Sequence, residues 1–192
     1  SSDLEALEAN LKKLLKTIES SGLSYSNPVL RGKDINKAIS LRKAGLGLLG
    51  NMVGDRKAVA CIEDTAVSLP DLKAFIGEFT KIMKDYGQDA VYYAHAGAGE
   101  LHLRPILNLK RSEDVSLFRA ITTDVAKLTK KYGGSFSGEH GDGIVRAEFI
   151  PLMLGEENYE LLKRIKSYFD PDHIFNPGKI VDAYPMDESL RY

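Results

Sequence analysis

Three of the four histidines of the chain lie in two short glycine-rich segments. His95 and His102 flank the run HAGAGELH, and His140 directly follows Glu139 in the run SGEHGDG. Two imidazoles and a carboxylate, with one coordination position left open, form a ligand set typical of catalytic zinc. An imidazole beside that carboxylate is suited to act as a general base near neutral pH. The residue types therefore predict a divalent metal site, for which zinc is the first candidate, with His140 as a base next to it.

The spacing of His95 and His102 requires a turn between them. On a regular strand, residues seven apart point to opposite faces of the sheet and could not share a ligand. Gly97 and Gly99 permit backbone angles that other residues avoid, so the chain can turn and bring both imidazoles into one site. Imidazole and carboxylate also suit manganese or iron. From spacing alone, ordinary loop histidines remain the alternative.

Hydrophobic spacing indicates which elements position these segments. Apolar residues recur at helical intervals and predict five helices, over residues 3–20, 34–44, 71–86, 113–132 and 156–168. Strands are predicted over residues 57–67, 89–94 and 101–109, the first of which carries Glu63 and Asp64 near its end. The run SGEHGDG is then a loop. Few strands separated by helices predict an α+β fold, a small mixed sheet with helices packed on one face.

Two further segments resemble functional motifs but are interpreted otherwise. The run GLGLLG, residues 45–50, matches the letters of a dinucleotide-binding loop, yet it follows a predicted helix. A dinucleotide loop must follow a strand and open a helix, so we expect this run to stop the helix and connect to the next strand. Cys61 lies in the apolar run AVACI and is expected in the core, while His173 is expected to be structural.

Composition excludes several classes of protein. The net charge of −1 gives no basic field for nucleic acid or an anionic membrane, so no nucleic-acid partner is expected. We find neither a transmembrane segment nor a signal peptide pattern. A lone cysteine excludes an internal disulfide and fits a reducing compartment, so a cytoplasmic protein is expected. The abrupt ends, SSDLEALEANL and ESLRY, predict that residues 1–192 are a fragment of a longer protein.

Four motifs in order resemble one family. The runs IEDTAV, HAGAGELH, SGEHGDG and FDPDHIFNPGK resemble the C-terminal domain of FAD-linked oxidases, the family of D-lactate dehydrogenase, the glycolate oxidase flavoprotein subunit and D-2-hydroxyglutarate dehydrogenase. The resemblance covers roughly residues 30–182. It implies a ferredoxin-like α+β fold with a small antiparallel sheet, FAD as cofactor, and an FAD-binding domain elsewhere in the same full-length chain. The phrase LRKAGLGLLG and the arginine of LHLRP resemble large bacterial members that also carry iron–sulfur clusters.

The resemblance also implies roles for the residues of the two histidine runs. His95, His102 and Glu139 match the metal ligands of members that act on 2-hydroxy acids, and His140 matches the catalytic base. The implied reaction oxidises a D-2-hydroxy acid to the 2-oxo acid, with the hydride passing to the flavin. The electron acceptor is left open. One option is an acceptor at the inner membrane, which would bind the protein peripherally to that membrane.

Other positions are implied for substrate and cofactor. Arg42, in SLRKAG, falls where members place an arginine for the substrate carboxylate. Asn176, in NPGK, falls in a segment near the flavin, and Gly97 and Gly99 would let the flavin approach the backbone.

At three positions the chain differs from the residues that are common in the family. Ala98 and Glu100 stand where Asp and Asn are commoner, and Ile62 stands where some members have a substrate-binding lysine. The missing charge has three candidate replacements: Arg56, Lys57 and Arg104, of which Arg104 is taken as the substrate-binding residue. Two other functions stay open, a stand-alone metallohydrolase and a non-catalytic ferredoxin-like interaction domain.

Overall fold

The computed structural model describes residues 2–190, except for the side chains of residues 2 and 46. The chain forms two compact units, one ending at Gly47 and one beginning at Leu48. The first unit contains helix α1 (Ser2–Ser21), a 3-10 turn (Gly32–Asp34) and most of helix α2 (Ile35–Gly50). Within it, Arg31 pairs with Glu8 of α1 at 2.6 Å.

Helix α2 is longer than predicted. It continues through the glycine run to Gly50, so the expected helix stop and connecting loop at residues 45–50 is wrong. A glycine inside a helix costs about 1 kcal/mol relative to alanine, and the intervening leucines are good helix formers. None of the three glycines has the positive φ that is typical of a glycine ending a helix. Because residues 45–50 are helical, they do not form a dinucleotide-binding loop, as expected from the sequence.

A small antiparallel sheet forms the centre of the second unit, as the family resemblance implied, whereas the mixed sheet expected from the element order is wrong because every strand pair is antiparallel. Strand β4 is central, because β2 and β3 both pair with its residues 100–103 and therefore lie on opposite edges. Strand β1 pairs with the other end of β4, at Ile106 and Leu107. The strands are β1 (Lys57–Ala58), β2 (Ile62–Ala66), β3 (Ala90–His95) and β4 (Glu100–Leu107).

The strand predicted over residues 57–67 is interrupted between β1 and β2. Pro105 of β4 lies beside the interruption and accepts a hydrogen bond from the Val59 N–H at 2.8 Å. Proline has no N–H to donate in return, so the ladder cannot be continuous on this edge.

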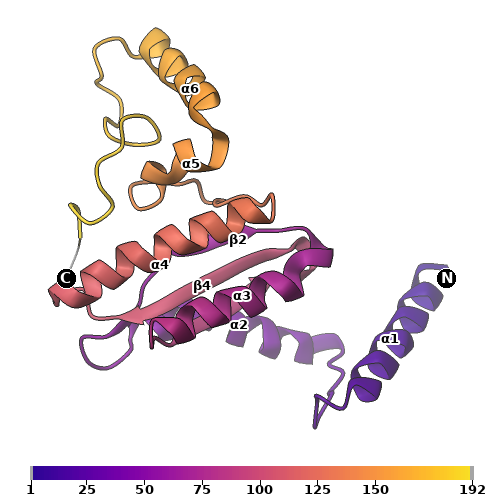
Figure 1. Cartoon of the computed structure of the whole chain (residues 1–192). Helices are drawn as coiled ribbons and strands as arrows, with labels where there is room; N and C mark the ends of the chain where they lie inside the picture. The colour runs from indigo at the N-terminus through magenta and orange to yellow at the C-terminus, as the bar shows by residue number, and fades with distance from the viewer. Residues whose placement is uncertain (1, 191–192) are drawn as a thin grey trace. The chain divides into compact units, whose positions relative to one another are not determined.

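Helices α3 (Leu72–Asp85) and α4 (Ser112–Lys131) pack side by side on one face of the sheet (Figure 1). The chain then continues into a 3-10 turn (Ala147–Phe149), α5 (Ile150–Leu154) and α6 (Glu156–Phe169). The α+β class and the helices on one face are thus confirmed. The 3-10 turns and α5 were not predicted, because segments of three to five residues are too short to show helical periodicity. Within residues 2–190, no helix combines the length and apolarity needed to cross a membrane.

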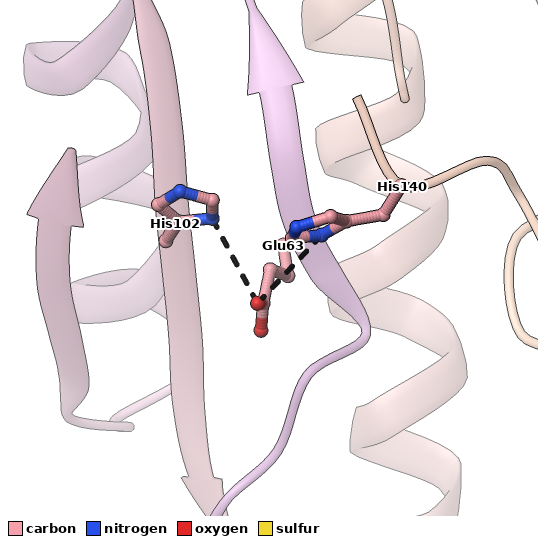
Figure 2. Close-up of side chains that lie close together, drawn as sticks. All are labelled: Glu63, His102 and His140. Carbon is pink, nitrogen blue, oxygen red and sulfur yellow. Dashed lines mark ion pairs between the residues drawn. The ribbon is translucent and has the colours of Figure 1, made fainter. Parts of the chain in front are cut away.

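Alternation along β4 separates a polar face of the sheet from an apolar one. Leu101 and Leu103 are buried on the side of the helices, and His102 between them faces the other way. His102 pairs in register with Tyr93 on one edge and with Glu63 on the other. Cross-strand partners share a face, so Glu63 and His102 lie together on the polar side (Figure 2).

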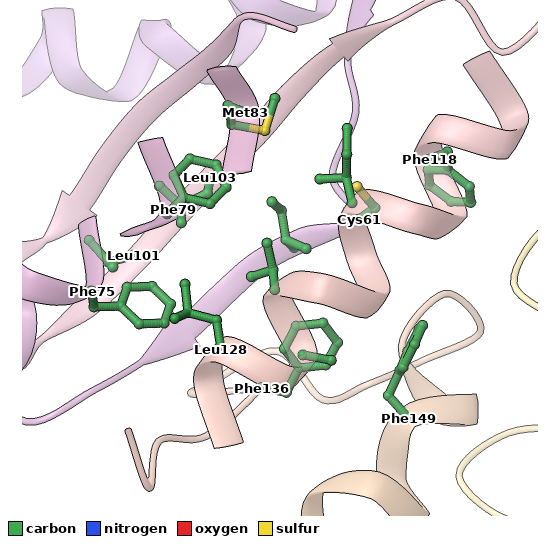
Figure 3. Close-up of a cluster of buried hydrophobic side chains, with 14 of the residues drawn as sticks. Cys61, Phe75, Phe79, Met83, Leu101, Leu103, Phe118, Leu128, Phe136 and Phe149 are labelled. Carbon is green, nitrogen blue, oxygen red and sulfur yellow. The ribbon is translucent and has the colours of Figure 1, made fainter. Parts of the chain in front are cut away.

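The apolar face forms the core with the two helices (Figure 3). Cys61 is fully buried there, as predicted, and burial raises the pKa of its thiol to about 11. The thiol is therefore not ionised near neutral pH, which suits a packing role. The largest fully buried side chains from the helices are Phe75 and Phe79 of α3 and Phe118 and Ile121 of α4.

Gly99 is the glycine that the turn between β3 and β4 requires. It has φ +74°, and a Cβ atom there would lie 2.1 Å from the carbonyl oxygen of Val67, whereas Gly97 has open space around it. We expect Gly99→Ala to lower the free energy of unfolding by about 1–3 kcal/mol, because it adds backbone strain and a clash. Gly97→Ala should change it by less than about 0.5 kcal/mol. Urea denaturation measures both, and equal stability of the two variants would contradict this assignment.

Candidate metal and substrate site

The structure brings His95, His102 and Glu139 together on the polar face of the sheet. One potential ligand atom from each lies within 4.8 Å of the others. The turn achieves this by pairing His95 with Glu100, two residues along β4 from His102, so both imidazoles share a face. His95 Nε2 lies 3.7 Å from Glu139 Oε1, and the two imidazole centroids are 5.2 Å apart.

His140 lies against this group rather than apart from it. Its Nε2 is 3.2 Å from Glu139 Oε1, and its ring stacks on that of His102 with centroids 5.7 Å apart. Half of its side chain is exposed, whereas that of His102 is buried. The imidazole is thus both next to the predicted ligands and accessible to a small molecule.

Glu63 is a site residue that sequence reasoning did not assign. Its Oε1 lies 3.8 Å from His102 Nδ1 and 4.0 Å from His140 Nδ1, so the carboxylate sits between the two imidazoles (Figure 2). It also forms an ion pair with Arg104, and Tyr93 donates its hydroxyl hydrogen to it at 3.4 Å. Glu63, His102 and His140 form a second group that could hold an ion. The only feature of the sequence that could have indicated Glu63 is the pair of adjacent acidic residues in IEDTAV.

Asp64, the next residue, is fully buried beneath the loop that carries Glu139 and His140. Burial opposes its ionisation, but hydrogen bonds from the backbone N–H of His140, from Glu100 and from the backbone N–H of Glu139 hold the pKa of this carboxyl at about 2. The same contact with Asp64 raises the pKa of Glu100. Asp64 is therefore the more acidic of the two carboxyls and is ionised near neutral pH, with Glu100 as its more easily protonated neighbour.

Buried polar atoms without a hydrogen-bond partner gather on this face. Among the described residues they include His102 Nδ1, Glu100 Oε1 and Arg104 Nε. Buried polar groups are normally satisfied, so such a cluster indicates a place for a polar ligand or an ion. Burial also lowers the pKa of His102, which favours the neutral imidazole that a metal requires. The donor set and its unsatisfied atoms fit a divalent metal.

The remaining predicted residues differ in their placement. Of the three candidate cations, Arg104 lies at the site, whereas Arg56 donates to Gln88 and to the Ile106 carbonyl, and Lys57 donates to the Met52 carbonyl. Arg42 lies on α2 in the first compact unit. Asn176 is exposed on the segment after α6, where it accepts a hydrogen bond from Lys179.

The chain belongs to a known family. The family model described as FAD linked oxidases, C-terminal domain, matches residues 1–180. The family membership that the four motifs predicted is thereby confirmed.

Three of the relatives bear the names of a dehydrogenase or oxidase of a hydroxy acid. D-2-hydroxyglutarate dehydrogenase of Pseudomonas putida is 40% identical over 156 residues, which cover 81% of this chain and 15% of that protein. D-lactate dehydrogenase of Archaeoglobus fulgidus is 32% identical over 128 residues, 67% of this chain and 28% of the relative. Glycolate oxidase subunit GlcD of Bacillus subtilis is 25% identical over 139 residues, 72% of this chain and 29% of the relative. The chain thus spans less than a third of the length of these relatives.

Proposed function

We propose that this chain is the substrate-binding part of an FAD-dependent enzyme that oxidises a D-2-hydroxy acid to the 2-oxo acid. The observation that carries the proposal is the convergence of His95, His102 and Glu139, with His140 against them, on an open polar face. Family membership and the names of the relatives support the reaction class. A domain that binds most of the FAD, in the same full-length chain, belongs to the proposal, as do iron–sulfur clusters elsewhere in that chain.

The metal would be held by His95, His102 and Glu139, and zinc is the first candidate for it. When bound, a divalent ion supplies Lewis acidity to the hydroxyl and carboxylate oxygens of the substrate, and the flavin supplies the hydride acceptor. The part of this chain is to place the substrate and to remove one proton.

His140 would take the hydroxyl proton of the substrate. Its Nε2 is the ring nitrogen on the side of Glu139, so a proton accepted there comes from the ligand side of the cluster. Its Nδ1 lies 4.0 Å from Glu63, and that carboxylate would stabilise the imidazolium that forms. Glu63 is in turn held by Arg104, so its position does not depend on the substrate.

Arg104 is the proposed partner of a substrate carboxylate. Its guanidinium is largely buried, lies 5.6 Å from the centroid of the Tyr93 ring, and has an unpartnered Nε. Guanidinium groups donate strong, charge-assisted hydrogen bonds to carboxylates, and the Nε–H of Arg104 is left over from its pair with Glu63. Arg42 is proposed as a second such residue, and Asn176, Gly97 and Gly99 as contacts of the flavin.

Zinc titration of the chain tests the metal site directly. We expect one strongly bound equivalent by competition with a chromophoric chelator, and a fall in affinity of more than about 100-fold for His95→Ala, beyond the cost of losing a supporting residue. His173→Ala is the matched control, because it removes the exposed fourth histidine from the segment after α6 and should leave zinc affinity unchanged. Equal affinities in the two variants would refute the site. Metal-dependent ester hydrolysis by the chain alone would favour a hydrolase instead.

A further inference from the structure

We infer that Asp64 is the positioning residue that fixes Glu139 and His140 relative to the two histidines of the β3–β4 turn. The inference rests on the metal site proposed above. It concerns a residue that neither binds the metal nor takes part in the proposed reaction. Asp64 lies at a bulge of β2, where the register with β4 shifts between Glu63 and Thr65. Its φ of +80° directs a fully buried carboxylate away from the regular ladder.

Both oxygens of this carboxylate accept hydrogen bonds from one loop. Oδ1 accepts from the Glu139 N–H at 2.8 Å. Oδ2 accepts from the His140 N–H at 2.8 Å and from the Ser137 hydroxyl at 2.9 Å. These contacts bridge up to 76 residues of sequence. The two adjacent residues with different proposed tasks are therefore held by the two oxygens of a single side chain.

The backbone around Asp64 completes the anchor. The Gly138 N–H donates to the Asp64 carbonyl oxygen at 2.7 Å. Arg146 lies 3.7 Å from the Asp64 carboxylate, and its guanidinium donates to the Gly141 carbonyl at 2.6 Å, on the far side of the same loop. A Cβ atom on Gly138 would lie 3.2 Å from Asp64 Oδ1, which is tighter than most Cβ contacts, so the loop approaches this carboxylate closely.

These contacts distinguish anchoring from metal ligation. Asp64, Glu139 and His140 do have ligand atoms close enough together to hold an ion. The Asp64 oxygens, however, already accept hydrogen bonds from the Ser137 hydroxyl, the Glu139 and His140 N–H groups and the Glu100 carboxyl, and they lie beneath the loop at 0% exposure. A ligand must present a free lone pair to the ion, whereas a supporting residue presents its hydrogen bonds to the ligands. The structure assigns Asp64 to the second task.

The test is Asp64→Asn, read by two independent measurements. Asparagine tolerates a positive φ, so the bulge is retained, but its NH₂ group turns one oxygen acceptor into a donor that faces backbone N–H groups. We expect amide hydrogen exchange at Glu139 or His140, measured by NMR without metal, to rise roughly 10- to 100-fold. We expect zinc affinity to fall roughly 10- to 100-fold.

Asp170→Asn is the matched control. Asp170 is also buried, accepts the N–H groups of Ile174 and Phe175 at 2.8 and 3.0 Å, and pairs with Lys166. The control should speed exchange at those two amides and leave zinc affinity unchanged. A general loss of stability would affect zinc binding in both variants and would overturn the inference.

The outcomes separate this inference from the proposed function. Unchanged exchange at Glu139 and His140, or faster exchange with unchanged zinc affinity, overturns the role of Asp64 while the metal site stands. Absence of zinc binding by the unsubstituted chain refutes the proposed site, and amide exchange then still decides whether Asp64 anchors the loop. If Asp64→Asn does not fold, Gly138→Ala replaces it, because its Cβ atom would require the loop to shift by a few tenths of an ångström against an intact carboxylate. Roughly tenfold weaker zinc binding is then expected, and unchanged binding overturns the inference.

Discussion

Replacing His140 with alanine is expected to slow flavin reduction by the substrate 10²- to 10⁴-fold, the usual contribution of a general base. The measurement is stopped-flow absorbance of the flavin in the full-length enzyme to which we propose this chain belongs. His140 lies 3.2 Å from Glu139, yet it is not among the three proposed ligands. The metal content of the variant should therefore stay close to that of the unsubstituted enzyme.

Glu139→Gln is the matched comparison, because it changes the neighbouring residue by a single group. It should weaken metal binding, so that added zinc restores part of the lost rate, whereas added zinc should not help His140→Ala. The division of roles would be refuted by a wild-type rate of flavin reduction in His140→Ala, or by a loss of metal as severe as in Glu139→Gln.

Arg104→Met is expected to lower kcat/KM by roughly 10²- to 10³-fold for a substrate whose carboxylate it binds, the range for removing one partner of a buried charge pair. D-2-hydroxyglutarate is the substrate to test first, because relatives at 40% and 39% identity bear its name. D-lactate, which lacks the second carboxylate, is the comparison. A loss confined to the diacid assigns Arg104 to the distal carboxylate, and no loss with either substrate would contradict a role in binding.

The variant also leaves Glu63 buried beside the two histidines without its cation. Breaking such a pair is itself costly, so the double variant Arg104→Met, Glu63→Gln is needed as a control. In the double variant, folding stability and zinc affinity should return toward those of the unsubstituted protein. The kcat/KM for D-2-hydroxyglutarate should stay low relative to that for D-lactate. Recovery of activity toward the diacid would show that the single variant acted through the stranded carboxylate.

The sequence predicted those features of the fold that depend on local patterns. Helices α3, α4 and α6 appear close to their predicted ranges, because each presents an apolar stripe at helical spacing over fourteen or more residues. The end of α2 was missed, because glycine lowers helix propensity without forbidding a helix. The break between β1 and β2 was missed as well, because it is associated with Pro105, which lies on another strand.

For the site, the sequence alone determined the residue types, their glycine-rich setting and the need for a turn between His95 and His102. That turn is local, since a positive φ at Gly99 reverses the chain within a few residues. Only the tertiary structure decided that Glu63 sits between two imidazoles and that Asp64 anchors the loop of Glu139 and His140. Both residues act through strand register and backbone hydrogen bonds between segments far apart in the chain. Such contacts leave no periodic trace in sequence, because the Glu139 and His140 N–H groups that Asp64 binds belong to the backbone, which is the same whatever the side chain.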